Sequence, residues 1–240
     1  MYASEACIEQ ELLCCLGSPI RVSIARDPVD PALLSSGEKR RLDELKPRAR
    51  VLSWLRGRAA LKRLLESLGQ NQDTSEVRFP NRELSLTHSG PVAIAVASRD
   101  SSWSGIGVDL EIGRGPSPKS ARLFLADGEL RSIASIAPEA LRRLWTVKEA
   151  LYKANVANAR SWFTDYRVLD PLAIAGDAVL SSSAGDITFR YASIAALGGV
   201  LTAAVASRAH GAAGARAGGA CTGGGISAPL EEVLDGTNHR

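Results

Sequence analysis

The chain has 240 residues, of which 45% are hydrophobic and 23% are charged, and it carries a formal net charge of +3. A chain of this length can bury one sizeable core or two small lobes, and the composition is that of a soluble globular protein. No apolar run approaches the ~20 residues that span a bilayer. The acidic start, residues 1–11, lacks the basic region of a secretory signal, so we expect a cytoplasmic protein.

The cysteines argue against a zinc site and against a disulfide framework. They are Cys7, Cys14, Cys15 and Cys221. They form no Cys-x-x-Cys pattern and have no metal-ligand spacing with the histidines. We therefore expect reduced thiols, as in a reducing compartment.

A basic run coincides with two predicted helices in the first half of the chain. We expect a short strand at 19–25, a helix that opens with a serine cap at 35–38, and a helix at 48–68 that ends at Gly69. The basic residues of the run are Lys39, Arg40, Arg41, Lys46, Arg48, Arg50, Arg56, Arg58, Lys62 and Arg63. Such a patch suits an anionic cofactor or an acidic protein partner, or it is a solvated helix face. Nucleic acid is disfavoured because no aromatic stacking platform lies nearby.

The rest of the chain is predicted to form strands interrupted by helices. Strands are expected at 85–87, 92–98, 103–111, 166–169, 187–191 and 200–206, and helical segments at 121–134 and 140–154. Segments 92–98 and 201–207 are alike in composition, which is compatible with a duplicated lobe or with chance. Beyond residue 208 the chain is rich in Gly and Ala, and we expect a flexible tail.

Two short segments, about forty positions apart, carry the most specific chemistry. The first, residues 106–111, has the sequence Ile-Gly-Val-Asp-Leu-Glu and ends a predicted buried strand. Residues two apart on a strand point to the same side, so Asp109 and Glu111 should project together.

The second segment, residues 145–153, has the sequence Trp-Thr-Val-Lys-Glu-Ala-Leu-Tyr-Lys within a predicted helix. The spacing of i, i+4 and i+8 brings Trp145, Glu149 and Lys153 near one face of that helix. A third carboxylate and an ammonium group therefore lie in one line.

Three carboxylates of this kind suit a hard cation such as Mg²⁺, which keeps several waters and shares substrate phosphates with the protein. A lysine one helical turn beyond the third carboxylate could offset charge that develops on a phosphate. Each segment alone could instead be a surface feature, either a solvated turn or an i,i+4 ion pair worth ~0.2–0.5 kcal/mol. Together they favour a divalent-metal and phosphate site.

In this order and spacing the segments resemble the signature of the 4'-phosphopantetheinyl transferases, in which Gly-Val-Asp precedes Trp-Ser/Thr-x-Lys-Glu-Ala-x-x-Lys. Every fixed position of the second motif is filled here. A third segment, Leu-Thr-His-Ser-Gly at 86–90, is similar to the family's Ser-His-Ser-Gly/Asp. The resemblance covers roughly residues 34–170. It is closest to the longer, two-lobed members, which prime carrier proteins of nonribosomal peptide and polyketide synthases.

The resemblance implies an α+β fold of two similar α/β lobes related by a pseudo-two-fold axis, each a small, mainly antiparallel sheet packed with helices. We expect an N-terminal lobe at 1–103, a C-terminal lobe with the metal motifs at 104–207 and a flexible Gly/Ala-rich tail at 208–240. The resemblance further implies a monomer whose partners are coenzyme A and an apo acyl or peptidyl carrier protein. It implies neither nucleic acid nor a membrane as a partner.

The resemblance also implies a role for each matched residue. Asp109, Glu111 and Glu149 would hold Mg²⁺, and Glu149, directly or through a water, would take the proton from a serine of the carrier protein. Lys153 would stabilise the leaving 3',5'-ADP, so the expected catalytic residues are Glu149, Lys153 and Asp109. The expected contacts to coenzyme A are Arg58, Lys62, His88, Thr87, Ser89, Lys148 and Lys153. Among them, His88 would contact the 3'-phosphate.

Two departures from the family pattern leave contacts open. Where the family has Gly-Lys-Pro ahead of the histidine motif, residues 79–83 are Phe-Pro-Asn-Arg-Glu, and Arg82 could replace the lysine. After Lys153, the family's Gly-rich loop is replaced by Ala-Asn-Val-Ala-Asn at 154–158. Glu129 resembles a family glutamate near a helix start, and we expect only a structural role for it.

Two other functions are compatible with the same motifs. One is a non-catalytic module of the same fold that binds coenzyme A or a carrier protein; the intact carboxylates and Lys153 argue against it, because binding alone would not need them all. The other is a broader Mg²⁺-dependent phosphotransferase that acts on nucleotides. The lack of a Gly-x-x-x-x-Gly-Lys-Ser/Thr loop counts against this second function.

Overall fold

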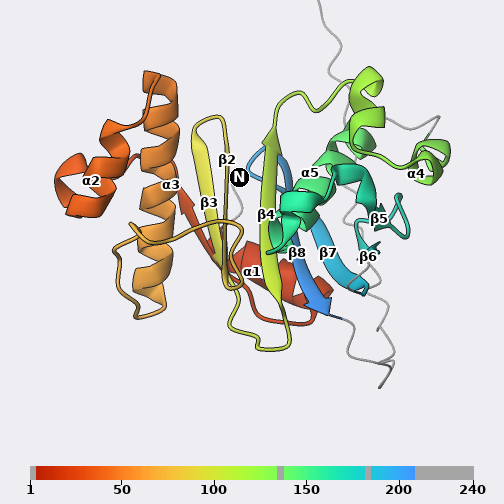
Figure 1. Ribbon diagram of the computed structural model, residues 1–240, viewed down its shortest axis with the longest axis horizontal. Helices are drawn as coiled ribbons and strands as arrows, with labels where there is room; N and C mark the ends of the chain where they lie inside the picture. Colours follow the sequence, from red (N-terminus) through yellow and green to blue (C-terminus); the bar gives the residue numbers. More distant parts are fainter. Residues whose placement is uncertain (1–3, 134–137, 182–184, 209–240) are drawn as a thin grey trace, which may run out of the picture.

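The computed structural model of the chain describes residues 4–133, 138–181 and 185–208, and it shows helices packed against two antiparallel sheets (Figure 1). The α+β class expected from the sequence is therefore confirmed. None of the helices in these ranges is long and apolar enough to cross a membrane. The expected tail lies outside the described residues from residue 209 onward, as does Cys221.

The bounds of the elements are as follows. The α-helices are α1 (Glu5–Leu16), α2 (Ser36–Asp43), α3 (Arg48–Ser67), α4 (Asp127–Ser132) and α5 (Pro138–Ala154). The strands are β1 (Arg21–Ala25), β2 (Leu84–Ser89), β3 (Val92–Ala97), β4 (Gly105–Ile112), β5 (Tyr166–Val168), β6 (Ala175–Leu180), β7 (Ile187–Ala196) and β8 (Gly199–Arg208). The short 3-10 helices are η1 (Pro31–Leu33), η2 (Pro118–Leu123), η3 (Asn158–Arg160) and η4 (Phe163–Asp165).

The first sheet has the strand order β1-β3-β2, with α3 on one of its faces. All residues of the central strand β3 are buried, so this strand has no solvent-exposed face. Helix α3 packs Ala60, Leu61 and Leu64 on the small side chains of β3. Outside α3 lies α2, whose start is fixed by a reciprocal capping box between Ser35 and Glu38.

The second sheet has the strand order β4-β8-β7-β6-β5, with α5 across one face. Leu144, Val147 and Leu151 of α5 are fully buried against this sheet. They are spaced at i, i+3 and i+7, which is the apolar stripe that the helix requires for burial. The opposite side of α5 remains accessible along Glu149 and Lys153.

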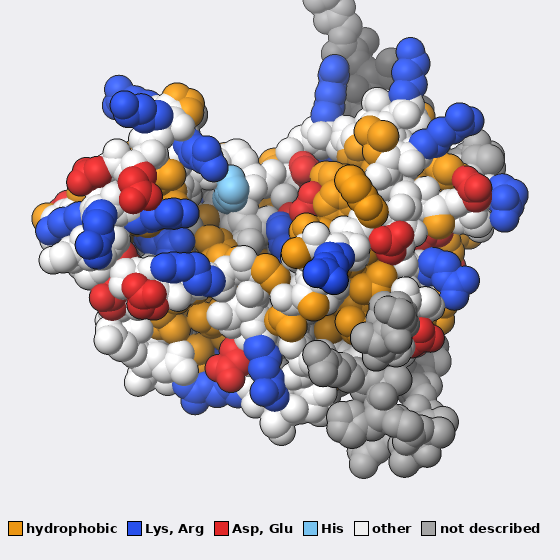
Figure 2. Space-filling view, in the orientation of Figure 1, with side chains coloured by type: hydrophobic (Ala, Val, Ile, Leu, Met, Phe, Trp, Pro, Cys, Tyr) orange, Lys and Arg blue, Asp and Glu red, His pale blue; other side chains and the backbone are white. Residues whose placement is uncertain are grey.

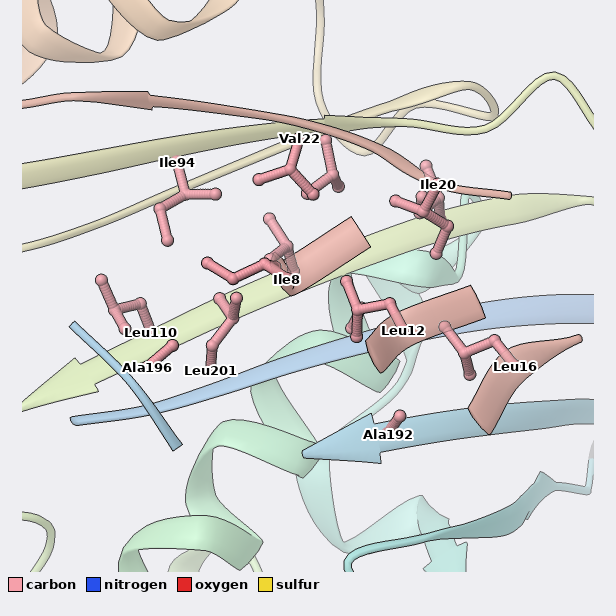
Figure 3. Close-up of a cluster of buried hydrophobic side chains, with 14 of the residues drawn as sticks. Ile8, Leu12, Leu16, Ile20, Val22, Ile94, Leu110, Ala192, Ala196 and Leu201 are labelled. Atoms are coloured by element: carbon pink, nitrogen blue, oxygen red, sulfur yellow. The ribbon is translucent and has the colours of Figure 1, made fainter. Parts of the chain in front are cut away.

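Helix α1 joins the two sheets on the face that α5 leaves uncovered (Figure 1). Its side chains Ile8, Leu12 and Leu16 have no exposed surface, and they lie among apolar side chains of both sheets (Figure 3). The carboxylates of Glu5 and Glu9 also accept hydrogen bonds from backbone amides of β1, at 2.6 and 2.8 Å. The lobe boundary expected at residue 103 stays a prediction, since this core includes residues from both sides of it.

The two sheets meet along β2 and β4 through side-chain hydroxyl groups. Ser85, Thr87 and Ser89 of β2 accept hydrogen bonds from successive outward amides of β4. The accepting pairs are Ser85 with Val108 (3.0 Å), Thr87 with Leu110 (3.3 Å) and Ser89 with Ile112 (3.0 Å). We call these three residues the hydroxyl ladder. Because period-2 alternation turns all three hydroxyls to one side of β2, the ladder satisfies amides that would otherwise lie at a buried sheet edge.

The structure corrects three local expectations. Helix α1 was not predicted, although a Ser4 cap, apolar residues at i, i+4 and i+8, and Gly17 after the last turn all signal a helix. The helix expected at 121–134 is split into η2 and α4, because the Glu129 carboxylate accepts from the amide of Ala126 and starts a new helix there. Strand β6 was also missed, since its sequence Ala-Gly-Asp-Ala-Val-Leu has little strand propensity.

Candidate active site

Two glycines of β4 allow helix α5 to approach this strand closely. A Cβ atom at Gly105 would lie 2.0 Å from the carbonyl oxygen of Ala154, and one at Gly107 would lie 1.9 Å from that of Ala150. No side chain fits into such gaps, so only glycine permits the contact between the two backbones. The carboxylates at the end of β4 thereby come next to the accessible face of α5.

Lys153 lies at the centre of the polar contacts between β4 and α5. Its Nζ is 2.7 Å from Oδ1 of Asp109 and 3.8 Å from Oε2 of Glu149. It also donates to the carbonyl oxygen of Val108 at 3.2 Å. Asp109 is only 6% exposed, whereas Glu149 and Lys153 keep part of their surface. The structure thus brings together residues that the two sequence segments placed about forty positions apart.

Burial and mutual repulsion alter the acidity of two carboxyl groups at this place. Burial raises the pKa of Glu149, the charges of Asp109 and Glu111 raise it further, and Lys153 opposes the shift. The pKa of Glu111 is also raised, first by burial and then by the charge of Asp109. The three carboxyl groups therefore share one electrostatic environment, and a carboxylate with a raised pKa is a suitable proton acceptor near neutral pH.

The metal-ligand role expected for the three carboxylates stays a prediction. Within the described ranges, no group of three or more His, Cys, Asp or Glu side chains is arranged so that it could hold a metal ion by itself. Mg²⁺ commonly binds one or two carboxylates, keeps several waters and takes further ligands from phosphate groups. Asp109, Glu111 and Glu149 are hard oxygen donors that repel one another, which is the chemistry such an ion would require of them.

A basic cavity of about 800 Å³ lies on the first sheet, lined by α2, α3, β2 and the segment that joins α3 to β2. Its basic side chains are Arg40, Arg41, Arg50, Arg58, Arg78 and His88. Figure 2 shows Lys and Arg side chains gathered over α2 and α3. This concentration of cations suits a ligand that carries several phosphate groups.

Arg58 is fixed in the wall of the basic cavity by its neighbours. Its Nη1 donates to the carbonyl oxygen and to the hydroxyl of Thr74, at 3.1 and 3.0 Å. Its guanidinium lies 4.8 Å from the ring centroid of Trp54, within the range of a cation–π contact. Two buried polar atoms of the lining, Nε of Arg58 and Oγ of Ser53, have no hydrogen-bond partner within the described structure. Buried polar atoms without a partner are uncommon in folded proteins.

His88 connects the basic cavity to the carboxylates. It lines the cavity, yet the charges that act on its ring include those of Lys153 and Asp109. Loss of water contact and the Lys153 ammonium lower the pKa of His88, and Asp109 opposes this shift. An extended anionic ligand that runs from Arg58 past His88 would therefore reach Lys153.

Two of the lysines expected at the cofactor lie elsewhere. Lys148 has no exposed surface, and its Nζ contacts the carboxylate of Glu129 at 2.7 Å and the carbonyl oxygen of Tyr166. Lys62 donates at 2.8 Å to Glu38 and does not line the basic cavity. The phosphate contact expected for Lys148 stays a prediction; in this structure its ammonium group has no exposed surface and forms a buried ion pair. Glu129 has the structural position expected for it.

The hydroxyls expected at coenzyme A belong to the hydroxyl ladder. Thr87 is buried, and its hydroxyl donates to Oδ1 of Asp109 at 3.0 Å. The Ser89 hydroxyl accepts from the amide of Ile112. Neither residue lines the basic cavity, so the histidine motif contributes to that cavity through Leu86 and His88.

Arg82, which was considered for the phosphate, lies outside the basic cavity, and Arg78 lies in its wall. Arg82 donates to the carbonyl oxygens of Ser101 and Trp103, at 3.2 and 3.3 Å, and it does not line the basic cavity. Arg78 lines the cavity, and its charge acts on Arg58. The sequence analysis overlooked Arg78, which lies one position before the segment compared with the family's Gly-Lys-Pro. The only signal was its proximity to the histidine motif.

A comparison with protein families found a match to part of the chain. Residues 105–205 match the family model of the 4'-phosphopantetheinyl transferase superfamily. The match begins at the first residue of β4 and ends within β8, so it contains Asp109, Glu111, Glu149 and Lys153. The elements α2, α3 and β2, which line the basic cavity, lie outside it. A comparison with curated proteins gave no significant match.

Proposed function

Because residues 105–205 belong to the 4'-phosphopantetheinyl transferase superfamily, as the motifs predicted, we propose that the protein transfers the 4'-phosphopantetheine group of coenzyme A to a serine of an apo acyl or peptidyl carrier protein. The superfamily supports phosphopantetheinyl transfer in general. The carrier class, the Mg²⁺ dependence and the two-lobed subtype are part of the proposal. The observation that carries it is the contact of Lys153 with both Asp109 and Glu149 beside the basic cavity.

The reaction replaces a phosphoanhydride bond of coenzyme A with a phosphoester bond to the carrier serine. The serine oxygen attacks the β-phosphorus of the coenzyme A pyrophosphate and forms a new phosphorus–oxygen bond, while the bond to the leaving 3',5'-ADP breaks. The serine proton passes to Glu149, directly or through a water. Burial raises the pKa of Glu149, which makes its carboxylate a stronger proton acceptor than an exposed one.

Lys153 acts on the charge that the reaction moves. Its ammonium group, held 2.7 Å from Asp109, would offset the negative charge that develops on the leaving phosphate. Mg²⁺, when held by Asp109, Glu111 and Glu149, would supply Lewis-acid stabilisation of the pyrophosphate oxygens. The mutual repulsion that raises the pKa of Glu111 and Glu149 supports a site that gains from a bound cation.

The nucleotide end of coenzyme A is proposed to occupy the basic cavity. Arg58, Arg78 and His88 all line the cavity, and the proposal assigns them to phosphate groups. Lys62 and Lys148 are left out, because each is held in an ion pair with a glutamate.

A non-catalytic binding module is the second candidate, since the basic cavity alone could bind coenzyme A. Binding requires cations, but it does not require a buried carboxylate with a raised pKa beside a lysine. The pair of Glu149 and Lys153 therefore favours the enzyme. The monomeric state and the cytoplasmic location expected from the sequence belong to the same proposal.

The proposal is tested by incubating the protein with coenzyme A, Mg²⁺ and a panel of apo carrier proteins, followed by mass spectrometry of the carriers. We expect the mass of one phosphopantetheine to be added to the serine of at least one carrier, and no addition when EDTA removes the metal ion. The Asp109→Ala variant should bind coenzyme A and transfer nothing. Binding of coenzyme A without transfer to any carrier would instead support the binding module.

A further inference from the structure

We propose that Thr87 is a positioning residue, whose hydroxyl orients the carboxylate of Asp109 toward the reacting groups. The inference rests on the proposed function for its catalytic consequence, but its structural basis is independent of the carrier protein. It also replaces the direct coenzyme A contact that the histidine motif suggested for Thr87.

Two protein donors meet the same oxygen atom of Asp109. The Thr87 hydroxyl donates to Oδ1 at 3.0 Å, and the Lys153 ammonium lies 2.7 Å from that atom. Among the described residues, Oδ2 accepts no protein hydrogen bond. Two donors on Oδ1 restrict rotation of the carboxyl group, so Oδ2 is the oxygen left for a cation or a substrate group.

Thr87 is itself held in one orientation. Its side chain is 3% exposed, and its Oγ1 accepts from the amide of Leu110 while it donates to Asp109. A hydroxyl has one proton, so the amide bond on its acceptor side leaves that proton for the carboxylate. Valine has nearly the same shape without this donor, and serine has the donor without the methyl group.

The hydroxyl ladder supplies the comparison that isolates this effect. Ser85 and Thr87 are both buried, both lie on β2, and each accepts from one amide of β4. Only Thr87 adds a bond to a carboxylate that faces the site. Removal of the Ser85 hydroxyl therefore measures the stability lost with one hydrogen bond of the ladder. Removal of the Thr87 hydroxyl should cause a similar loss of stability and, in addition, any change in metal affinity or kcat that depends on the orientation of Asp109.

The position of Thr87 also connects the two parts of the site. It directly precedes His88, which lines the basic cavity, and it contacts Asp109 across the seam between the sheets. The strand that presents His88 to the cofactor therefore also orients a carboxylate of the facing wall. Groups that support a metal-binding carboxylate typically change metal affinity or activity by about tenfold to a hundredfold when they are removed.

The experiment compares Thr87→Val, Thr87→Ser and Ser85→Ala with the parent protein. Thermal unfolding reports the stability of each variant, and titration with Mn²⁺ in the presence of coenzyme A, followed by electron paramagnetic resonance, reports metal affinity. We expect Thr87→Val to bind Mn²⁺ about tenfold to a hundredfold more weakly, with a similar loss of kcat in the transfer assay. Thr87→Ser should stay close to the parent, and Ser85→Ala should lose stability only.

Equal Mn²⁺ affinity and kcat in Thr87→Val and Ser85→Ala would overturn the inference, because Thr87 would then be only one more bond of the ladder. If Thr87→Val does not fold, Thr87→Cys takes its place, since a thiol is a much weaker donor in nearly the same space. The Thr87→Cys variant should bind Mn²⁺ more weakly than Thr87→Ser. Equal Mn²⁺ affinities of these two variants would overturn the inference. A parent protein that transfers nothing would refute the proposed function, while the Mn²⁺ comparison would still decide the role of Thr87.

Discussion

The two facing walls of the site are built from opposite charges, and they hold those charges in different ways. The wall formed by α2, α3 and β2 carries arginines, which stay charged at any relevant pH. The wall formed by β4 and α5 carries carboxylates, of which Glu111 and Glu149 have a raised pKa. The first wall is suited to bind phosphate without further help, whereas the second requires a cation or a proton to balance its charge.

This difference indicates which wall should affect coenzyme A binding and which should affect the chemical step. Fixed cations bind the ground state and the transition state alike, so they should govern the affinity for coenzyme A. Carboxylates that exchange a proton or bind a metal act on the reacting atoms, so they should govern kcat. Three pairs of substitutions follow, in order of decreasing expected effect.

The largest effect is expected from Glu149→Gln, which removes the proton acceptor of the second wall while it preserves shape. We expect kcat to fall by about 10²–10⁴, because general base catalysis contributes roughly that factor. The affinity for coenzyme A, measured by calorimetry, should stay near that of the parent. Glu139→Gln is the matched control, since Glu139 lies exposed in the first turn of the same helix. Parent-like transfer by Glu149→Gln would remove Glu149 from the chemistry.

The next prediction is that substitutions of two lysines of α5 have different consequences, one for stability and the other for activity. Lys148→Met leaves the buried carboxylate of Glu129 without its partner, and breaking one half of a buried pair costs about 3–5 kcal/mol. Lys153→Met should lose far less stability, because the Lys153 side chain is 28% exposed, but it should abolish transfer. Chemical denaturation and the transfer assay give both values. A stable Lys148→Met protein with weakened coenzyme A binding would restore the phosphate contact first expected for Lys148.

The smallest effect is expected in the first wall, from a pair of neighbouring arginines. Arg78→Ala should raise the KM for coenzyme A about tenfold with kcat unchanged at saturation, since a charge-assisted hydrogen bond contributes about 1.5–3 kcal/mol. Arg82→Ala should leave both constants unchanged, because Arg82 is bonded to backbone carbonyls outside the basic cavity. A raised KM in Arg82→Ala together with an unchanged KM in Arg78→Ala would instead assign the phosphate contact to Arg82.

Much of the fold was predictable because its signals are local. The serine and glutamate of the α2 capping box, the alternating hydroxyls of β2 and the apolar stripe of α5 each follow from a short stretch of sequence. Helix α1 carried equally local signals but was not recognised. Strand β6 had no such signal, since it is held as a strand by its pairing with β5 and β7.

By itself the sequence determined which groups meet at the carboxylates. The Gly-x-Gly-Val-Asp-x-Glu order requires glycine where α5 touches β4, and helical spacing turns Glu149 and Lys153 to the same side. The tertiary structure decided how far each basic residue lies from that place. Lys148 became a buried partner of Glu129, and Arg78 took the position considered for Arg82. Long side chains with similar charge are not distinguished by spacing along the chain, because their partners come from elements that only folding brings together.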